Sequence, residues 1–420
     1  MDISMKWEKV SGSENAILSK SDAHRALIAA ALCDKPTSFN LSSLSKDIEA
    51  TLSCLVSLGA RVEKNDNSLT LYPTFEKARN PVLDCNECGS TLRFLIPVAA
   101  AVAENPCFTG KDGLRKRPLS PLLLEMEKRG CHFSNSFIPF TVSGSLNSGE
   151  FTLPGNISSQ FISGLLFSLP LLDGDSKIVL SSHLESVAYV DMTIDTLDKF
   201  GIHVEKEDGA FIIKGNQKYI SPNEYTIEGD WSNIAPFMAA AAMGGEITAL
   251  GLNPASKQSD KSILSVLEKF GAEIKYENST YIIKKKNANP IEIDVSQFPD
   301  LFPVIAILAC TAEGKSRLYN AKRLRIKESD RIESTLALIK SLGGNAEADE
   351  DSLTIYGSGS LSGGVCDSFN DHRIVMASAV ASVISKTEVI IKNSEAINKS
   401  YPGFFTHFKC TGGIYQCHHK

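Results

Sequence analysis

A repeating pattern of apolar and polar positions runs along the chain. In each copy an amphipathic stretch with helical periodicity ends at a glycine, and two short strand-like stretches follow around a polar turn. The clearest copy runs from Asp47 to Gly59 and continues with strands at 61–62 and 68–72. The glycines that end the copies, spaced by 71, 71, 70, 72 and 69 residues, are Gly59, Gly130, Gly201, Gly271, Gly343 and, in the weakest copy, Gly412. Each stands where we expect a left-handed helix C-cap.

A second pattern alternates with the first: a polar start followed by a segment rich in Ala, Leu and Ile. These segments are apolar nearly all round, as in residues 235–243, which predicts helices buried on most faces. The polar starts are 69, 69, 73, 68 and 71 residues apart and are Ser21, Ser90, Ser159, Ser232, Asp300 and Asp371. We expect five of them to be helix N-caps, and Ser90 to be either a cap or the first helical residue.

Together the two patterns predict six units of about 70 residues. The last unit, residues 370–420, is about 20 residues short, and a strand near Ile3–Val10 would complete it. The chain would then start in one domain, cross to the other for three units, and return. We therefore expect an α/β fold of two domains, each with three β-α-β-α-β-β units, formed by residues 1–18 with 229–420 and by residues 19–228. The alternative is a coincidental spacing of common Leu-Gly helix ends.

Composition and charge narrow the class of protein. The chain has 420 residues, 43% apolar and 22% charged, which is typical of globular proteins. Its net charge of −6 argues against a non-specific nucleic-acid binder. Residues 1–10 carry acids and no apolar core, unlike a secretory signal, and the richest apolar stretch, 94–103, is about half the length of a membrane helix. We expect a cytoplasmic protein that binds neither nucleic acid nor membrane.

Ten cysteines are scattered along the chain, and we expect them to be reduced thiols. Cys85 and Cys88 form a Cys-x-x-Cys pair, which raises the question of zinc. A structural zinc site needs a second pair, and the candidates are Cys410, Cys417, His418 and His419. We favour two thiols that are adjacent by chance beside a glycine turn, and a solvated His418-His419 tail.

Positive charge coincides with the predicted helix starts. Lys20 and Arg25 flank the first start, Arg93 and Arg117 follow the second, and Arg373 follows the last. A further run before another helix contains Arg323, Arg325, Lys327 and Arg331. Helix N-termini carry partial positive charge, so two domains that aim them at one cleft would bind anions there. Any one of these arginines alone would more commonly be a surface charge.

The sequence lacks the motifs typical of nucleotide-binding and zinc-dependent enzymes. The chain has no Gly-x-x-x-x-Gly-Lys-Ser/Thr loop and no His-Glu-x-x-His box, and residues 357–364 do not have dinucleotide-binding spacing. We therefore predict acid–base chemistry on anionic substrates without a bound cofactor or metal.

The combined motifs resemble the 5-enolpyruvylshikimate-3-phosphate synthase family of enolpyruvyl transferases over nearly the whole chain. The segments that carry the resemblance are Lys20-Ser21 with Arg25, Gly89 to Arg93, Arg117-Pro118, Leu153 to Gln160, Pro299-Asp300, Arg325 to Arg331, Asp371-His372-Arg373 and Lys399 to Pro402. The resemblance implies two domains of three units each, the family's inside-out α/β barrels, with the active site in the cleft between them. It implies transfer of the enolpyruvyl group of phosphoenolpyruvate to the 5-hydroxyl of shikimate 3-phosphate, with release of phosphate, in aromatic amino-acid biosynthesis.

The resemblance also assigns roles to residues. Asp300 would take the hydroxyl proton, and Lys20 would neutralise charge between the substrates. Glu328 would handle the methylene proton, with Lys399 as a candidate partner in that step; His372 is a further catalytic candidate. The implied contacts of shikimate 3-phosphate are Lys20, Ser21, Arg25, Ser158, Ser159, Gln160, Ser186, Asp300 and Lys327. The implied contacts of phosphoenolpyruvate are Lys20, Gly89, Arg117, Gln160, Arg331, Arg373 and Lys399. On position alone, Asp300 would be read as a helix cap.

The chain departs from the family pattern at three positions. Glu87 stands where many members have Asn, Cys88 where Ala or Ser is common, and Arg323 where some members have Asn. Glu87 puts negative charge beside the implied phosphoenolpyruvate site, or pairs with a nearby arginine. The family inhibitor glyphosate competes with phosphoenolpyruvate. Gly89 favours inhibition and Glu87 with Cys88 opposes it, and we expect glyphosate to inhibit this protein.

Two other functions compete with this interpretation. A sister enzyme that uses UDP-N-acetylglucosamine has a cysteine in the loop before Arg-Pro, and the corresponding loop here, 109–117, has none. A catalytically inactive scaffold would not need Lys20, Asp300, Glu328 and Arg373 together. We expect the protein to be a monomer.

Overall fold

The computed structural model describes residues 1–41, 44–73 and 76–418, so His419 of the candidate zinc set lies outside the described residues. The chain divides into two compact units. Unit 1 comprises Met1–Ser19 and Glu228–Lys420, and unit 2 comprises Lys20–Ile227. The chain therefore enters unit 2 after Ser19 and returns to unit 1 at Glu228.

Unit 2 contains three four-stranded sheets, with strand orders β16-β3-β5-β4, β10-β11-β9-β7 and β12-β13-β15-β14. The strands are β3 (Thr37–Phe39), β4 (Arg61–Asn65), β5 (Ser68–Tyr72), β7 (Val82–Asp84), β9 (Cys107–Thr109), β10 (Cys131–Phe133), β11 (Phe140–Gly144), β12 (Glu150–Leu153), β13 (Ser176–Leu180), β14 (Val204–Glu207), β15 (Ala210–Ile213) and β16 (Glu224–Tyr225), with a small pair β6 (Ala78–Arg79) and β8 (Ala103–Glu104). The helices are α1 (Lys20–Ala31), α2 (Lys46–Ser57), α3 (Gly89–Val102), α4 (Asp112–Arg115), α5 (Ser120–Glu127), α6 (Ser159–Ser168), the 3₁₀ turn η1 (Leu169–Leu171) and α7 (Val187–Lys199).

Unit 1 also contains three four-stranded sheets, with strand orders β18-β19-β17-β2, β20-β21-β23-β22 and β24-β25-β1-β26. The strands are β1 (Asp2–Trp7), β2 (Ser13–Asn15), β17 (Glu246–Leu250), β18 (Glu273–Glu277), β19 (Thr280–Lys284), β20 (Glu292–Asp294), β21 (Gly314–Tyr319), β22 (Asn345–Ala348), β23 (Ser352–Gly357), β24 (Gly364–Asp367), β25 (Val389–Lys392) and β26 (Gly413–His418). The helices are α8 (Trp231–Gly244), α9 (Ile263–Phe270), α10 (Phe302–Cys310), α11 (Arg331–Ser341), α12 (His372–Ala381) and α13 (Phe404–Cys410), with 3₁₀ turns η2 (Ser259–Ser262), η3 (Pro299–Leu301), η4 (Lys322–Ile326) and η5 (Ser394–Lys399).

The sheets share one topology. In four of them, the strand before an apolar helix pairs in parallel with the strand after it: β7 with β9, β12 with β13, β20 with β21, and β24 with β25. In the other two sheets this parallel partner comes from a different place in the chain. β2, which precedes α1, pairs with β17 after α8, and β16, which precedes α8, pairs with β3 after α1. Both β2 and β16 lie next to a crossover, so each strand joins the sheet of the unit that the chain is about to leave.

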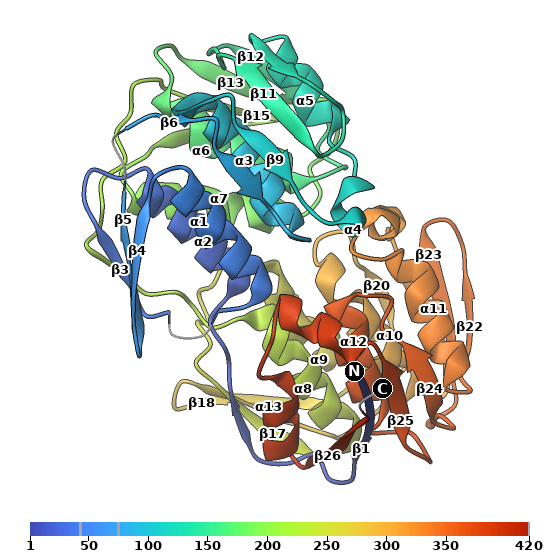
Figure 1. Cartoon of the computed structure of the whole chain (residues 1–420). Helices are drawn as coiled ribbons and strands as arrows, with labels where there is room; N and C mark the ends of the chain where they lie inside the picture. The colour runs from blue at the N-terminus through green and yellow to red at the C-terminus, as the bar shows by residue number, and fades with distance from the viewer. Residues whose placement is uncertain (42–43, 74–75, 419–420) are drawn as a thin grey trace. The chain divides into compact units, whose positions relative to one another are not determined.

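The N-terminal strand β1 lies between β25 and β26, antiparallel to both (Figure 1). It therefore supplies the strand that the short last repeat lacks. The inward-facing residues Ile3, Met5 and Trp7 are at most 3% exposed, and the Trp7 indole donates to the carbonyl of Thr411.

The sequence predicted the helix ends more accurately than the helix starts. All six glycines at the predicted helix ends have φ between +75° and +105°, so that prediction is confirmed. Among the predicted N-caps only Asp371 is right; its side chain accepts from the amide of Arg373. The caps of α3, α6 and α8 are Cys88, Ser158 and Asp230, one or two residues before the predicted positions.

The other predicted caps lie within their elements. Ser21, Ser90, Ser159 and Ser232 are inside helices, and Asp300 is in the 3₁₀ turn η3, which has no side-chain cap. Neighbouring polar residues at each start compete for the same backbone amides, and the sequence pattern does not say which oxygen or sulfur reaches them.

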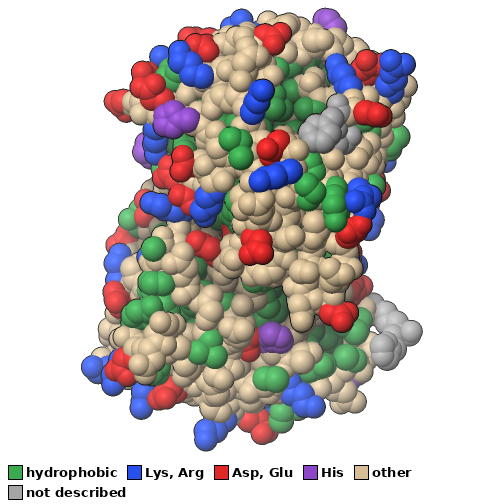
Figure 2. Space-filling view, turned by 90° about the vertical axis from the view of Figure 1, so that its left-hand side faces the viewer, with side chains coloured by type: hydrophobic (Ala, Val, Ile, Leu, Met, Phe, Trp, Pro, Cys, Tyr) green, Lys and Arg blue, Asp and Glu red, His purple; other side chains and the backbone are tan. Residues whose placement is uncertain are grey.

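The repeated apolar helices are buried, as their composition predicts. In α8 every residue from Trp231 to Met243 is buried, and in α10 every residue is. None of the helices in the described residues is long and apolar enough to cross a membrane. Figure 2 shows lysine and arginine side chains interspersed with aspartate and glutamate over the face it draws. Positive charge is therefore not gathered into a basic patch on that face.

Candidate functional site

In unit 2 the first turns of several helices meet through their side chains. Lys20, the first residue of α1, donates to the carboxylate of Asp47 in the first turn of α2, at 2.8 Å. His24 of α1 contacts Cys88, the cap of α3, and Gln160 in α6 donates to Ser90 in α3, at 2.8 Å. We call Lys20, Asp47, Gly89, Arg93 and Gln160, together with Arg117, the helix-start cluster. Converging helix N-termini add positive potential to its cationic side chains.

Gly89 allows two arginines to approach the start of α3. A Cβ atom at this position would lie 2.5 Å from Arg117 Nη1 and 2.8 Å from Arg93 Nη1, well inside contact distance. Arg93 donates to Gln160 Oε1 at 2.9 Å, and Arg117 is 8% exposed. The glycine thus makes room for two guanidinium groups beside the first amides of a helix, which is a favourable arrangement for an anion.

Arg25 is buried in the same unit and bridges α1 and α7. Its guanidinium donates to Thr193 Oγ1 and to the carbonyls of Ser21 and Tyr189, at 2.7 to 2.9 Å. Burial lowers the pKa of Arg25 to about 10, against smaller opposing effects of Tyr189 and Asp22. An environment that disfavours a buried cation to this degree would favour a neighbouring anion.

Three serines implied by the resemblance lie at helix starts of this unit. Ser158 caps α6, Ser159 is its first residue, and Ser186 precedes α7. Ser186 is 2% exposed and has a φ of 54°, a left-handed conformation that is unusual for serine. Such backbone strain is concentrated at functional sites, and here it adds weight to Ser186 as a site residue.

In unit 1 the candidate residues form a network of buried charges. Arg331, 1% exposed, donates to three carboxylates: Nη1 to Asp300 at 2.6 Å, Nη2 to Glu328 at 3.0 Å and Nε to Asp371 at 2.9 Å. Arg373 donates to the other oxygen of Asp300 at 3.1 Å. We call these five residues the arginine–carboxylate cluster.

The remaining candidates of unit 1 surround this cluster. His372 is 3% exposed, and its Nδ1 lies 3.7 Å from Asp371. Lys399, 9% exposed, donates to the carbonyl of Asn370 at 2.6 Å. Arg323, one of the departures from the family pattern, is buried and donates to the carbonyl of Ser296. The sequence therefore selected residues of unit 1 that are close neighbours in space.

The electrostatics of the cluster are set by its ion pairs. Burial raises the pKa of Asp300, but Arg331, Arg373 and Lys327 outweigh it and hold that pKa well below its usual range. Burial and the charge of Arg323 lower the pKa of Lys327 to about 7, although Asp300 opposes the change. Burial and the charge of Asp300 raise the pKa of Asp260 to about 7, against the pull of Arg373. Two groups beside Asp300 thus change protonation near neutral pH.

Sequence reasoning missed three acidic members of the site. Asp47 pairs with Lys20, Asp371 binds Arg331 besides capping α12, and buried Asp260 accepts from Ser232. Asp47 was noted only as part of a helix pattern, and Asp371 only as a cap and as part of the Asp371-His372-Arg373 motif, because a cap or a first-turn acid needs no further role. The lysines and arginines at the helix starts were the available signal, since buried cations require partners.

Two other features do not join these clusters. A cavity of about 320 Å³ in unit 2 is lined by Ala31, Leu58, Val102 and neighbours, near the C-terminal ends of α1 to α3. It contains none of the candidate site residues. Within the described part of the chain, one group of potential metal ligands converges, His24, Asp47 and Cys88, and it does not include Cys85.

Comparisons with known proteins agree on one family. The family profile described as EPSP synthase (3-phosphoshikimate 1-carboxyvinyltransferase) matches residues 6–408. A protein of that name from Clostridium novyi is 43% identical over 419 residues, covering 97% of this chain and 96% of the relative. One from Brachyspira hyodysenteriae is also 43% identical, covering 98% and 99%.

A solved structure supports the fold. The EPSP synthase of Acinetobacter baumannii superposes with a TM-score of 0.82, covering 99% of this chain and 100% of that one, at 22% sequence identity. The α/β architecture expected from the sequence is therefore that of known EPSP synthases.

Proposed function

Because this chain belongs to the EPSP synthase (3-phosphoshikimate 1-carboxyvinyltransferase) family, we propose that the helix-start cluster and the arginine–carboxylate cluster are the two halves of its active site. The reaction transfers the enolpyruvyl group of phosphoenolpyruvate to the 5-hydroxyl of shikimate 3-phosphate and releases phosphate. One hydroxyl must lose a proton and one methylene carbon must gain one, so the site needs a base and an acid besides its cations.

Shikimate 3-phosphate binds mainly to unit 2 in this proposal. Its proposed contacts in unit 2 lie near the starts of α1, α6 and α7 and are Ser21, Arg25, Ser158, Ser159, Gln160 and Ser186. The support is the buried guanidinium of Arg25, whose hydrogen-bond partners are uncharged oxygens. A phosphate nearby would raise the pKa of Arg25 back toward its ordinary value and gain charge-assisted hydrogen bonds from the serines. Lys327 of unit 1 adds a further cation to the same substrate.

Phosphoenolpyruvate binds to cations of both units. Arg117 beside Gly89 is the contribution of unit 2, and Arg331, Arg373 and Lys399 are the contribution of unit 1. Several arginines suit a substrate with a carboxylate and a phosphate, because each fork can hold two oxygens. Lys20 lies between the two substrates and neutralises the charge that both bring.

Asp300 is the proton acceptor for the 5-hydroxyl. With both of its oxygens on arginines, its pKa is held low and it is a weak base. Phosphoenolpyruvate offers these arginines new anionic partners, so its arrival reduces their hold on Asp300 and raises the basicity of that carboxylate. Glu328, with Lys399, protonates the methylene carbon as the 5-oxygen adds to the neighbouring carbon, and takes a methyl proton back as the C–O bond to phosphate breaks. His372, whose Nδ1 lies 3.7 Å from Asp371, is a further catalytic candidate. No step requires a metal or cofactor.

The observation that carries the proposal is the sharing of Asp300 between Arg331 and Arg373, which joins the proposed base to the proposed phosphoenolpyruvate site. A phosphate-release assay with phosphoenolpyruvate and shikimate 3-phosphate tests it. We expect turnover with this pair, none when UDP-N-acetylglucosamine replaces shikimate 3-phosphate, and a large loss in Asp300→Asn. Equal turnover with the sugar nucleotide would contradict the proposal.

We also propose that the two substrates draw the units together, because their negative charge is shared by cations of both. Small-angle scattering should show a smaller radius of gyration with shikimate 3-phosphate and glyphosate than without ligands, and an unchanged radius would contradict closure. Since one chain supplies every proposed group, we propose that a cytoplasmic monomer is the active form. Sedimentation at assay concentration tests the monomer.

A further inference from the structure

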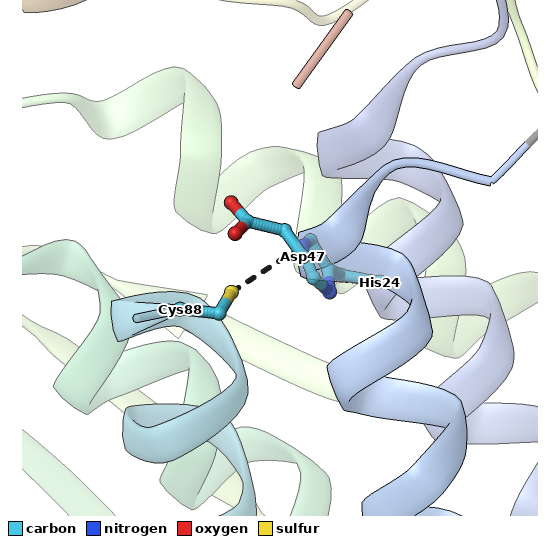
Figure 3. Close-up of side chains that lie close together, drawn as sticks. All are labelled: His24, Asp47 and Cys88. Atoms are coloured by element: carbon cyan, nitrogen blue, oxygen red, sulfur yellow. Dashed lines mark hydrogen bonds between the residues drawn. The ribbon is translucent and has the colours of Figure 1, made fainter. Parts of the chain in front are cut away.

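Three potential metal ligands meet beside Lys20, on the starts of three helices. His24 comes from α1, Asp47 from α2 and Cys88 from the cap of α3 (Figure 3). Their ligand atoms all lie within 4.8 Å of one another. His24 and Cys88 are buried, and Asp47 keeps 14% of its side chain exposed. An ion would therefore reach the cluster past the carboxylate.

The spacing of these atoms is close to that of a zinc site. With Zn–S near 2.3 Å and Zn–N or Zn–O near 2.0 to 2.1 Å, tetrahedral ligands are about 3.3 to 3.6 Å apart. His24 Nε2 and Cys88 Sγ are already 3.8 Å apart. If the longest separation between two ligand atoms shortens by about 1 Å, all three atoms can bind one ion. The fourth tetrahedral position then stays open for water.

The hydrogen bonds of His24 suit metal binding. Its Nδ1 is 2.7 Å from Thr51 Oγ1, which in turn donates to the carbonyl of Asp47. In the tautomer that fits, Nδ1–H donates to Thr51 and the lone pair of Nε2 points toward Cys88. Burial, with Lys20 and Arg25, lowers the pKa of His24 well below its ordinary value, so the ring is neutral at physiological pH.

The Cys88 thiol loses its proton, and so becomes a ligand, only when a metal ion binds. Burial raises the pKa of its thiol to about 12, with Asp47 adding to the effect. The free thiol is therefore a poor nucleophile, and it becomes a ligand only when a cation displaces its proton. Lys20 and Arg25 oppose a cation here, whereas a thiolate and a carboxylate together balance the charge of a dication.

We propose that His24 Nε2, Cys88 Sγ and a carboxylate oxygen of Asp47 bind a thiophilic divalent cation of the Zn²⁺ type, and that binding removes Asp47 from Lys20. The Cys88 S–H bond breaks, a sulfur–metal bond forms, and the proton leaves to solvent. Lys20 then loses the partner that positions it, and enzyme activity falls. The loss of activity rests on the role proposed above for Lys20, whereas metal binding does not.

Cobalt(II) titration of the full-length, reduced, chelator-treated protein tests the binding. Exposed Cys410 and Cys417 are first changed to serine to remove competing thiols. We expect one equivalent of Co²⁺ to bind and produce thiolate-to-cobalt charge-transfer absorption. The absorption should be lost in Cys88→Ser and His24→Gln, and should persist in Cys85→Ser, a matched control from the same Cys-x-x-Cys pair. Absorption that is absent from the parent, or that survives Cys88→Ser, would overturn the site.

Two further measurements keep the test decisive. If Cys88→Ser does not fold, X-ray absorption of the parent with bound Zn²⁺ decides: one sulfur with two or three nitrogen or oxygen neighbours supports the site, and a shell without sulfur overturns it. Thr51→Val should weaken Co²⁺ binding about 10- to 100-fold, because it removes the hydrogen bond that orients His24.

Activity is measured separately. Zn²⁺ at the saturating concentration found by titration should lower turnover of the parent at least tenfold, and a chelator should restore it. Turnover of Cys88→Ser should be the same with and without Zn²⁺. Full activity with Zn²⁺ bound would overturn the displacement of Lys20. Because binding is read without substrates, this outcome is distinct from failure of the proposed enzymatic function.

Discussion

Arg25 and Arg331 are equally buried but lie in opposite environments. Arg25 in unit 2 donates to neutral oxygens, and burial lowers its pKa to about 10. Arg331 in unit 1 donates to three carboxylates, which outweigh burial and raise its pKa. The surroundings of Arg25 thus hold positive charge beside neutral oxygens, whereas those of Arg331 neutralise it with the protein's own acids. Unit 2 also contains a paired cation, since Lys20 donates to Asp47. The difference suggests that unit 2 serves chiefly binding, whereas unit 1 combines binding with proton transfer.

The largest expected effect comes from removing the N-terminal segment with β1 and β2, both of which pair with strands of unit 1. Deletion of residues 1–18 removes Ile3, Met5 and Trp7 from the core of unit 1. Burial of three such side chains contributes about 5 to 9 kcal/mol, comparable with the stability of a whole domain. Hydrogen exchange should show unit 1 unprotected and 20–227 still protected.

Lys6→Ala is the matched control, because Lys6 is the exposed residue of the same strand. It should melt like the parent. A deletion variant with full protection in residues 228–420 would mean that β1 is dispensable, and unit 1 would not depend on its N-terminal strand.

Asp300→Asn tests the proton-transfer role of unit 1. Asparagine keeps the size of the side chain but cannot take the hydroxyl proton. We expect turnover to fall about 100- to 10,000-fold, with normal folding and with shikimate 3-phosphate still bound in calorimetry. Asp330→Asn is the control, because Asp330 caps α11 beside the cluster and asparagine caps equally well. Near-normal turnover of Asp300→Asn would remove this residue from the chemistry.

Arg117→Ala tests the binding role of unit 2. An arginine that holds substrate in both ground and transition states should affect the Michaelis constant more than turnover. Loss of a charged hydrogen bond of about 1.5 to 3 kcal/mol corresponds to a rise of about 10- to 100-fold in the Michaelis constant for phosphoenolpyruvate. Arg115→Ala, an exposed neighbour paired with Asp112, should leave it unchanged. A fall confined to turnover would place Arg117 in the chemical step.

Gly89→Ala should be a milder form of the same perturbation. A helical glycine replaced by alanine ordinarily gains about 0.5 to 1 kcal/mol, but here the new methyl group displaces Arg117. We expect the Michaelis constant for phosphoenolpyruvate to rise less than in Arg117→Ala, and glyphosate inhibition to weaken. Gly113→Ala is the control, since its nearest neighbour would be 3.8 Å away. Unchanged constants in Gly89→Ala would show that Gly89 does not line the substrate site.

The smallest expected signal is a proton taken up by Lys327. With a pKa of about 7 this amine is largely neutral at pH 8. The phosphate of shikimate 3-phosphate favours the charged form and raises that pKa, so binding at pH 8 should take up just under one proton. Calorimetry in buffers of different ionisation enthalpy measures the uptake. The proton uptake should vanish in Lys327→Met and persist in the control variant Lys340→Met. Uptake that persists in Lys327→Met would assign the proton to another group.

The sequence predicted best what depends on local backbone geometry. The six helix-ending glycines needed only a left-handed cap, and their spacing also revealed the repeat. The arginines and lysines of the site could be selected because they recur at helix starts. Asp47 and Asp260 could not, because their significance depends on which helices pack together, and that is a property of tertiary structure. The choice between Ser158 and Ser159 as cap depends on a single hydrogen bond.

The position of β1 has a consequence for synthesis of the protein. Its partners β25 and β26 begin at Val389 and Gly413, about 400 residues later. At about 5 to 20 residues per second the ribosome needs roughly 20 to 80 s to deliver them. Unit 2, which ends at Ile227, is complete before these partners are made, while Ile3, Met5 and Trp7 still have no sheet to join. β1 is made long before its partners and is among the last strands to join a sheet, so the nascent chain has to keep it from aggregating until they emerge.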